Sequence, residues 1–351
     1  MKQYHNLLNE ITTSGTLKDP ARPGMPPTIA IFGAMLKFDL SKGDFPLLTT
    51  KKVSYKNILT ELMWFLKGDT NVTYLLKNKC DIWLDDTYRG YLNKLAKTGG
   101  VTPFDKETFA NELLSSEHFS DEYGDLGPTY GYQWRNFGQE VDQIKKLIDG
   151  LIKSPTSRRH IITAWDPTVV DSLVLPPCHP FVQFNTIKLT MEERTQLFYN
   201  QGGSVYKTLD DEYLDIWEIP RFKLDCLFYM RSVDTFLGLP YNIASYATLL
   251  NVIAKIVGME VGELVFTAGD VHIYQTHTEQ VALQLTRDVN NFKLPSLALS
   301  GVFDEVQTYF KDEGFELDRF LKDLDKDLYG QIEIKNYQSF PYIKAPLSVG
   351  I

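Results

Sequence analysis

The sequence predicts a mixed α/β (α+β) fold in one large domain. Two segments place apolar residues at helical spacing, and three segments rich in β-forming residues are bounded by turn residues. A length of 351 residues is long for one domain and short for two. We therefore expect a single domain over 1–351, with insertions near 97–122 and 190–221.

The first predicted helix covers 57–76. Its apolar stripe consists of Leu59, Leu62, Met63, Phe65 and Leu66. Glu61 lies within this stripe, where an unpaired carboxylate is costly. The sequence thus marks Glu61 as a buried carboxylate that needs a partner or a role.

Strands are predicted at 160–164, 181–188 and 222–231, and their order suggests antiparallel pairing. The segment 190–221 between the last two is polar and acidic and contains a Gly-Gly pair. It is typical of an insertion between neighbouring strands rather than a separate domain.

A second helix is predicted over 246–257, with Gly258 as its stop signal. Before it, Gly238 and Pro240 predict a turn. The acidic, amphipathic segment 303–328 predicts one or two surface helices.

The composition narrows the classes of function. A net charge of −9 disfavours general nucleic-acid binding, because a polyanion is repelled. Three cysteines form neither a disulfide framework nor a zinc-binding pair of pairs. The chain shows no apolar run long enough for a bilayer and no secretory signal, so we expect a protein of the cytoplasm.

Cys178 is the leading candidate nucleophile, because two prolines before it fix the backbone beside the thiol. The alternative is a buried cysteine that acts as a small hydrophobe. Arg158, Arg159 and Arg231 flank it in sequence, and cations lower a thiol's pKa toward the reactive thiolate. The same arginines can hold a phosphate by forked hydrogen bonds.

Two further segments carry polar residues in apolar surroundings. The first contains Arg231, Ser232, Asp234 and Asn242. The amide of Asn242 can pair with a carbonyl and a neighbouring N–H of a ring such as uracil, whereas structural capping is the rival interpretation.

In the second segment, strand alternation puts His272 and Tyr274 on one face, where both can bind a ribose hydroxyl. A metal site made by His272 and His277 competes with this interpretation. Its spacing lacks a convincing third ligand, so no metal is expected.

Several blocks together resemble the thymidylate synthase family, in that family's order. They are TELMWFLKGDTN, IW, GDLGPTYGYQWR, SRRHIITAW, LPPCH, RSVDTFLGLPYNIASYA, GDVHIY and IKAP, and they span about 28–346. The resemblance implies a bent, mixed sheet flanked by helices, with the sheet as the interface of a symmetric homodimer.

The resemblance also implies roles in binding deoxyuridylate. Arg158 and Arg159 would reach the phosphate of the neighbouring subunit's substrate. The home-side contacts would come from Arg22, Arg231 and Ser232 to the phosphate, His272 and Tyr274 to the deoxyribose, Asn242 to uracil, and His179 to the nucleotide.

For the reaction, the resemblance implies that Cys178 adds to C6 of the pyrimidine and that C5 then attacks the methylene carbon of 5,10-methylenetetrahydrofolate. Glu61 would manage protons through water, and Tyr130 would assist removal of the C5 proton. Asp234 would serve both catalysis and folate binding. The other folate-side residues would be Trp83, Asp86, Gly238 and the terminal Ile351.

Departures from the family pattern leave one alternative open. The phosphate loop after Arg22 reads PGMPP, and Met230 and Asp166 replace the usual Gln and Asn. The tail continues past IKAP as LSVGI. The alternative is a deoxyuridylate hydroxymethylase, as in a virus with modified DNA, in which water captures the intermediate that hydride would reduce. Trp83 and the IKAP tail favour a dry site and thus reduction.

Overall fold

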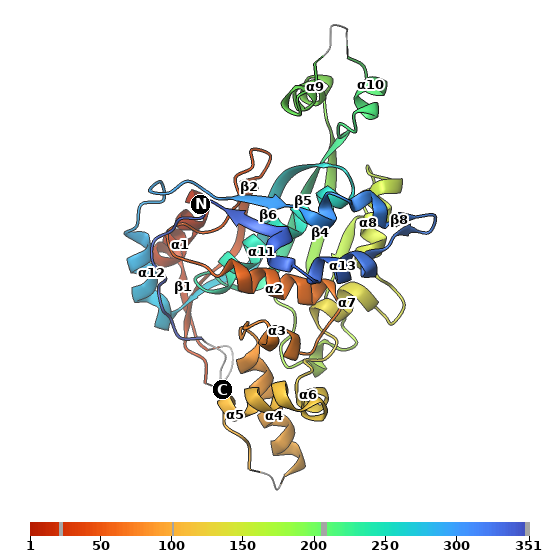
Figure 1. Ribbon diagram of the computed structural model, residues 1–351. Coiled ribbons are helices and arrows are strands. Elements are labelled where there is room, and N and C mark those ends of the chain that lie inside the picture. The colour runs from red at the N-terminus through yellow and green to blue at the C-terminus, as the bar shows by residue number, and fades with distance from the viewer. Residues whose placement is uncertain (21–23, 100–101, 205–208, 348–351) are drawn as a thin grey trace.

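A computed structural model describes residues 1–20, 24–99, 102–204 and 209–347. Its centre is a six-stranded sheet with the order β1-β2-β6-β5-β4-β3 (Figure 1). The strands are β1 (Thr16–Lys18), β2 (Thr28–Asp39), β3 (Ile161–Thr163), β4 (Phe181–Lys188), β5 (Phe222–Asp234) and β6 (Glu260–Tyr274).

Strand pairing in the sheet is antiparallel except between β5 and β6, which are parallel. The register of these two strands shifts between Leu224 and Cys226, and such a bulge bends a strand. The predicted mixed α/β class is confirmed, and so is the antiparallel pairing of the three predicted strands. β5 continues beyond its predicted end, to Asp234.

Helices connect and flank these strands. They are α1 (Lys2–Ser14), α2 (Tyr55–Leu66), α3 (Thr73–Lys77), α4 (Leu84–Thr98), α5 (Lys106–Ser115), α6 (Glu117–Tyr123), α7 (Tyr130–Asn136), α8 (Gln143–Lys153), α9 (Met191–Asn200), α10 (Asp211–Ile216), α11 (Gly238–Ile256), α12 (Thr278–Leu285), α13 (Leu317–Asp325) and α14 (Leu328–Gln331). Two small antiparallel sheets pair β7 (Ser296–Leu299) with β10 (Ile332–Lys335) and β8 (Phe310–Lys311) with β9 (Gly314–Phe315).

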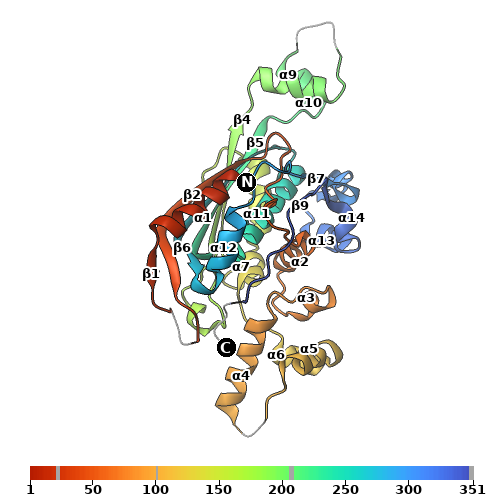
Figure 2. The same cartoon turned by 90° about the vertical axis from the view of Figure 1, so that its left-hand side faces the viewer.

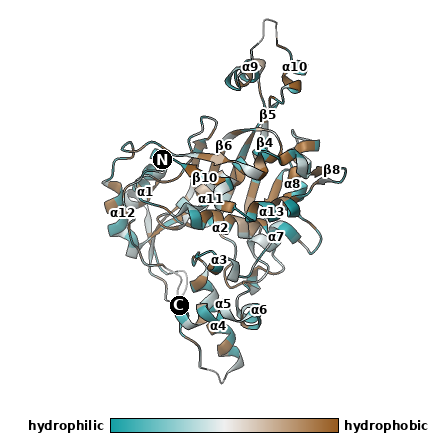
Figure 3. Cartoon of the chain, viewed as in Figure 1, coloured by the Kyte–Doolittle hydropathy of each residue, from teal (hydrophilic) through white to brown (hydrophobic). Residues whose placement is uncertain are grey.

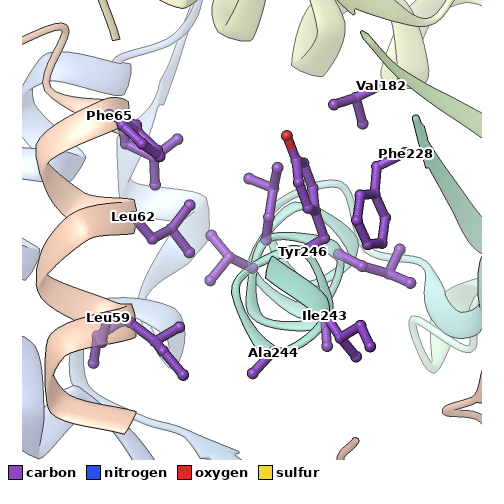
Figure 4. Close-up of a cluster of buried hydrophobic side chains, with 14 of the residues drawn as sticks. Leu59, Leu62, Phe65, Val182, Phe228, Ile243, Ala244 and Tyr246 are labelled. Carbon is purple, nitrogen blue, oxygen red and sulfur yellow. The ribbon is translucent and has the colours of Figure 1, made fainter. Parts of the chain in front are cut away.

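The core is organised around α11, which packs on β5 and β6 and also on α2. Figure 4 shows its side chains between Phe65 of α2 and Phe228 of β5. In Figure 3, strong hydrophobic colour lies on strands of the central sheet and on α8. None of the helices within the described ranges is long and apolar enough to span a membrane.

The sheet face opposite α11, which we call the outer face, exposes large apolar side chains. Directly paired residues of neighbouring strands share a face, and this rule places four of them together: Met35, Ile161, Ile187 and Tyr229. A Cβ on Gly269 would lie 3.0 Å from the hydroxyl of Tyr229 and 3.5 Å from the ring of Phe32. Phe32 therefore belongs to the same face, and it is 86% exposed.

The predicted helix over 57–76 is wrong as one element. It is two helices, because α2 ends at Leu66 and α3 begins at Thr73. Gly68 has a φ of 71°, which ends a helix, and the carboxylate of Asp69 then accepts the N–H of Asn71 at 2.9 Å. The apolar spacing continues across a turn that these polar contacts impose.

The second predicted helix begins earlier than expected. α11 starts at Gly238, and Pro240 lies in its first turn instead of a preceding turn. Proline is tolerated there because the first N–H groups of a helix have no partner within it. The predicted end is confirmed to within one residue of Val257.

The segment 190–221 connects β4 to β5 and contains α9 and α10, which project from the body at the top of Figure 1. Its apolar cluster, formed by Phe198, Leu214 and Ile219, is separate from the main core. Arg194 is buried and pairs with Asp211 and, at 2.7 Å, with Asp215. We call this segment the arm.

The other predicted insertion, near 97–122, differs from the arm. It contains α5, and Phe109 of that helix stacks on Tyr91 of α4 at 4.8 Å within the main core. Figure 2 shows α4, α5 and α6 together below the sheet. The segment 303–328 forms 3-10 turns and the β8-β9 hairpin before α13, so only part of it is the expected surface helix.

Candidate active site

Cys178 lies in the loop before β4, and Arg231 of β5 holds that loop. Its Nε and Nη2 donate to the carbonyls of Pro177 and Pro176, each at 2.8 Å. Nη2 also lies 3.8 Å from the Cys178 sulfur. A guanidinium at this distance favours the thiolate. The predicted cationic surroundings of the thiol are thus supplied, within one chain, by Arg231.

Tyr130 and His179 lie next to Cys178 and contact each other. The hydroxyl of Tyr130 accepts the backbone N–H of Cys178 at 2.6 Å, and its ring stacks on His179 with centroids 4.2 Å apart. Burial raises the pKa of Tyr130 well above its ordinary value and lowers the pKa of His179 to about 3. Both side chains are therefore neutral near pH 7.

Glu61 has the partner that the sequence analysis required. Trp83 Nε1 donates to its carboxylate at 2.7 Å. Burial raises the pKa of Glu61 to about 7, although the tryptophan hydrogen bond acts in the opposite direction. A carboxyl with this pKa can both accept and release a proton near neutrality.

The start of α11 brings Asp234, Gly238 and Asn242 together. Asp234 Oδ1 accepts the backbone N–H groups of Phe236 and Leu237 at 2.9 and 3.0 Å. A Cβ on Gly238 would lie 3.8 Å from Asn242 Oδ1 and 3.9 Å from the Asp234 Cβ. One oxygen of Asp234 therefore holds the turn that leads into α11, and Gly238 has no side chain to occupy the space beside Asn242.

The carboxyl end of β6 carries His272 and Tyr274 on one face, as predicted, with their rings 5.0 Å apart. Asp270 accepts from His272 Nδ1 at 2.8 Å and from Lys18 at 2.6 Å. These hydrogen bonds lower the pKa of Asp270 to about 2. His272 pairs with Asp234 in the β5-β6 register, so this face adjoins the start of α11.

The two histidines of the competing metal interpretation have other partners. His272 binds Asp270, whereas His277 Nε2 bonds the carbonyl of Pro346 at 2.8 Å. His277 Nδ1 lies 3.9 Å from Asp234 Oδ2. His277 thus lies between Pro346 of the carboxyl-terminal tail and Asp234.

Of the remaining predicted site residues, four lie within the described ranges and two lie outside them. Asp86 forms an ion pair with Arg89 at 2.5 Å. Arg158 and Arg159 are exposed in the loop before β3, and no contact of their side chains with Cys178 is seen in the described structure. Ser232 is half-buried on β5. Arg22 and Ile351 lie outside the described residues.

The structure adds residues that the sequence analysis missed. Tyr246 Oη lies 2.7 Å from His179 Nδ1, and the Arg231 guanidinium lies 5.7 Å from the Trp165 ring. Lys51 is buried, donates to the carbonyl of Phe236, and has its pKa lowered to about 7 by burial. Tyr246 and Trp165 lie within sequence blocks that resemble the family, so the sequence could have singled them out. Lys51 had no such signal.

Comparison with known proteins agrees with this arrangement. The family model described as thymidylate synthase matches residues 2–349. A Staphylococcus haemolyticus protein named thymidylate synthase is 38% identical over 372 residues, covering 99% of this chain and 98% of that protein. A Mycoplasma mobile protein of the same name is 40% identical over 350 residues, covering 99% of this chain and 100% of that protein. The chain therefore belongs to the thymidylate synthase family.

Proposed function

We propose that the chain methylates C5 of deoxyuridylate, with Cys178 as nucleophile and 5,10-methylenetetrahydrofolate as one-carbon donor. Its activity is that of a thymidylate synthase, a methyltransferase that gives thymidylate and dihydrofolate. The observation that carries the residue assignment is the 3.8 Å distance between the Cys178 sulfur and Arg231 Nη2. It supports a thiolate able to add to C6 of the pyrimidine.

Two groups are placed to move protons after this addition. The hydroxyl of Tyr130 accepts from Cys178 N–H and still has its own proton, since burial keeps the phenol neutral. It lies beside the nucleophile, where the C5 proton must leave. Glu61, with its pKa of about 7, exchanges protons with the pyrimidine through water.

Nucleotide recognition uses the residues at the ends of β5 and β6 and the start of α11. Asn242 reads the uracil carbonyl and N–H, because its amide offers both an acceptor and a donor. His272 and Tyr274 bind the deoxyribose hydroxyl, and His179 contacts the pyrimidine. Arg231 and Ser232, with Arg22, hold the phosphate.

The polar groups and the open space beside the start of α11 suit a bound folate. Asp234 Oδ1 accepts the N–H groups of the turn before α11, whereas no hydrogen bond to Oδ2 from another described residue is seen, so Oδ2 can accept from the pterin N–H groups. Gly238 leaves space there, and Trp83, Asp86 and Ile351 complete the folate side. The folate supplies the methylene carbon and the hydride that completes the methyl group. Trp83 and the tail exclude water while this happens.

The homodimer is part of this proposal. The outer face exposes Phe32, Met35 and Tyr229, and contiguous apolar surface of this kind is typical of subunit interfaces. Pairing two outer faces would bury these side chains. Arg158 and Arg159, at the β3 edge of the same sheet, would then reach the phosphate of the neighbouring subunit.

We propose the cytoplasm as the location. The cysteines Cys80, Cys178 and Cys226 are thiols in the structure, which suits a reducing compartment. No membrane or general nucleic-acid partner is part of the proposal, because the net charge of −9 opposes polyanion binding.

The experiment that tests the proposal uses 5-fluorodeoxyuridylate with methylenetetrahydrofolate. Fluorine cannot leave C5 as a proton does, so we expect a covalent complex of protein, nucleotide and folate in denaturing mass spectrometry. Peptide mapping should place it on Cys178, and the Cys178→Ala variant should form none. A complex on another residue would overturn the assignment of the nucleophile.

A further inference from the structure

Tyr246 lies deep in α11 and is 2% exposed. Its ring stacks on Phe228 of β5 with centroids 4.3 Å apart, as Figure 4 shows. Its hydroxyl oxygen lies 2.7 Å from Nδ1 of His179, the residue that follows Cys178. A buried tyrosine thus connects the main core to the chain beside the thiol.

The direction of this hydrogen bond follows from the surroundings. Within the described residues, the Tyr246 hydroxyl has no hydrogen-bond partner other than His179. If Nδ1 carried a proton and donated it, the phenolic proton would be left among apolar rings without an acceptor, which costs free energy. Tyr246 therefore donates and Nδ1 accepts.

The charge state of both groups agrees with this direction. Burial raises the pKa of Tyr246 well above its ordinary value, so the phenol keeps its proton. Burial lowers the pKa of His179 to about 3, so the imidazole is neutral and carries one proton. With Nδ1 accepting, that proton is on Nε2.

We infer that Tyr246 is a positioning residue, whose hydroxyl holds His179 in the tautomer with its proton on Nε2 and so presents an N–H donor to the substrate. Within the described residues Nε2 makes no hydrogen bond, and the side chain is 7% exposed. The ring stacks on Tyr130, whose hydroxyl contacts Cys178. A pyrimidine bound at this thiol offers carbonyl oxygens, which need a donor. This inference rests on the proposed function only for the identity of that substrate.

The test compares Tyr246→Phe with a matched control. The variant keeps the ring stacked on Phe228 and removes only the hydroxyl. Tyr55→Phe is the control. The hydroxyl of Tyr55 in α2 forms a hydrogen bond with Thr248 of α11, the helix that contains Tyr246, at 3.0 Å, and it lies outside the proposed site. Long-range ¹H–¹⁵N spectra of protein labelled at its histidines report the tautomer, and a His179→Gln sample assigns the signals.

In the unaltered protein we expect a protonated-type Nε2 shift and an unprotonated-type Nδ1 shift for His179 from pH 6 to 8. In Tyr246→Phe the two shifts should move toward each other, while Tyr55→Phe leaves them unchanged. In Tyr246→Phe, kcat for deoxyuridylate should fall about tenfold while KM changes little, because the variant lacks the hydroxyl that orients His179.

A proton on Nδ1 in the unaltered protein would overturn the inference, and so would unchanged shifts in Tyr246→Phe. Thermal unfolding of both variants checks that each is folded. If the shifts behave as expected but the unaltered protein does not turn over deoxyuridylate, the proposed function fails and the tautomer assignment stands.

Discussion

Burial sets the protonation of the groups around Cys178. Tyr130 and His179 are kept neutral, whereas the pKa of Glu61 rises to about 7. Arg231 supplies a charged group in contact with the thiol, at 3.8 Å. This combination supports a nucleophile stabilised as a thiolate beside neutral hydrogen-bonding groups and one titrating carboxyl.

Replacing the proposed nucleophile, Cys178, should separate chemistry from binding. We expect Cys178→Ser to lower turnover at least about a thousandfold, because an alcohol is a far weaker nucleophile than a cation-assisted thiolate. Nucleotide affinity, measured by calorimetry, should persist. Cys226→Ala is the control, since Cys226 is buried in the core and its thiol pKa is raised by burial. Substantial turnover by the serine variant would remove Cys178 from its role.

Glu61 also predicts a pH dependence of stability. Its folded pKa of about 7 exceeds the ordinary 4.5, so the folded state favours the protonated form. Any stability from this preference is fully present below pH 4.5 and is lost as pH rises through 7. Glu61→Gln cannot ionise and can still accept from Trp83.

We expect the free energies of unfolding of Glu61→Gln and the unaltered protein to agree near pH 4.5. At pH 8 the variant should be more stable, by up to about 3 kcal/mol. Urea unfolding at both pH values, at one protein concentration, measures this. An equal difference at both pH values would contradict the assigned pKa. The variant should also lose turnover.

Among the helices and strands, local polar contacts set a helix end that the apolar periodicity of the sequence did not predict. The apolar spacing over 57–76 is real, but the positive φ of Gly68 and the Asp69 side chain end α2. β3, β4 and most of β5 were predictable because each contains a run of β-formers next to turn residues. The start of α11 was not predictable, because glycine and proline in a first helical turn give the sequence pattern of a loop.

The arm packs separately from the main core of the protein. Its cluster around Phe198 is separate from the main core, and Leu189 N–H bonds the Arg221 carbonyl across its base at 2.9 Å. We expect that replacing 190–220 with Asn-Gly, a favoured two-residue hairpin turn, leaves kcat and the melting temperature nearly unchanged.

Phe198→Ala is a matched variant for the arm. It should loosen the arm alone, because it removes the centre of the small cluster, and limited proteolysis should then cut within 190–221. Loss of the deoxyuridylate activity in the excision variant would show that the arm is part of the catalytic unit, contrary to its description as an insertion.

At the scale of the whole molecule, the single chain leaves two features unexplained by its own contacts. The outer face exposes Phe32 and Tyr229, and no contact of the Arg158 and Arg159 side chains with Cys178 is seen within the described residues. The proposed two-fold pairing of outer faces would account for both. The sequence could suggest it only through the family resemblance, since periodicity does not report which sheet face is covered by another subunit.

Shared sites can be tested by complementation. Arg158→Ala and Cys178→Ala subunits should each be inactive alone. After mixing, unfolding and refolding, heterodimers should recover activity, because one of their two sites has both an intact thiol and an intact neighbouring arginine. Purified heterodimers without activity would show that each chain completes its own site. Refolded single variants serve as controls.

We propose that hydride completes the C5 methyl group, and the mass of the nucleotide product distinguishes this reduction from capture by water. The intact protein is incubated with deoxyuridylate and methylenetetrahydrofolate labelled in the methylene carbon, and the nucleotide is analysed by mass spectrometry. We predict chiefly thymidylate and dihydrofolate, with a rise in 5-hydroxymethyldeoxyuridylate when residues from Leu347 onward are removed. Mainly 5-hydroxymethyldeoxyuridylate and tetrahydrofolate from the intact protein would contradict the account.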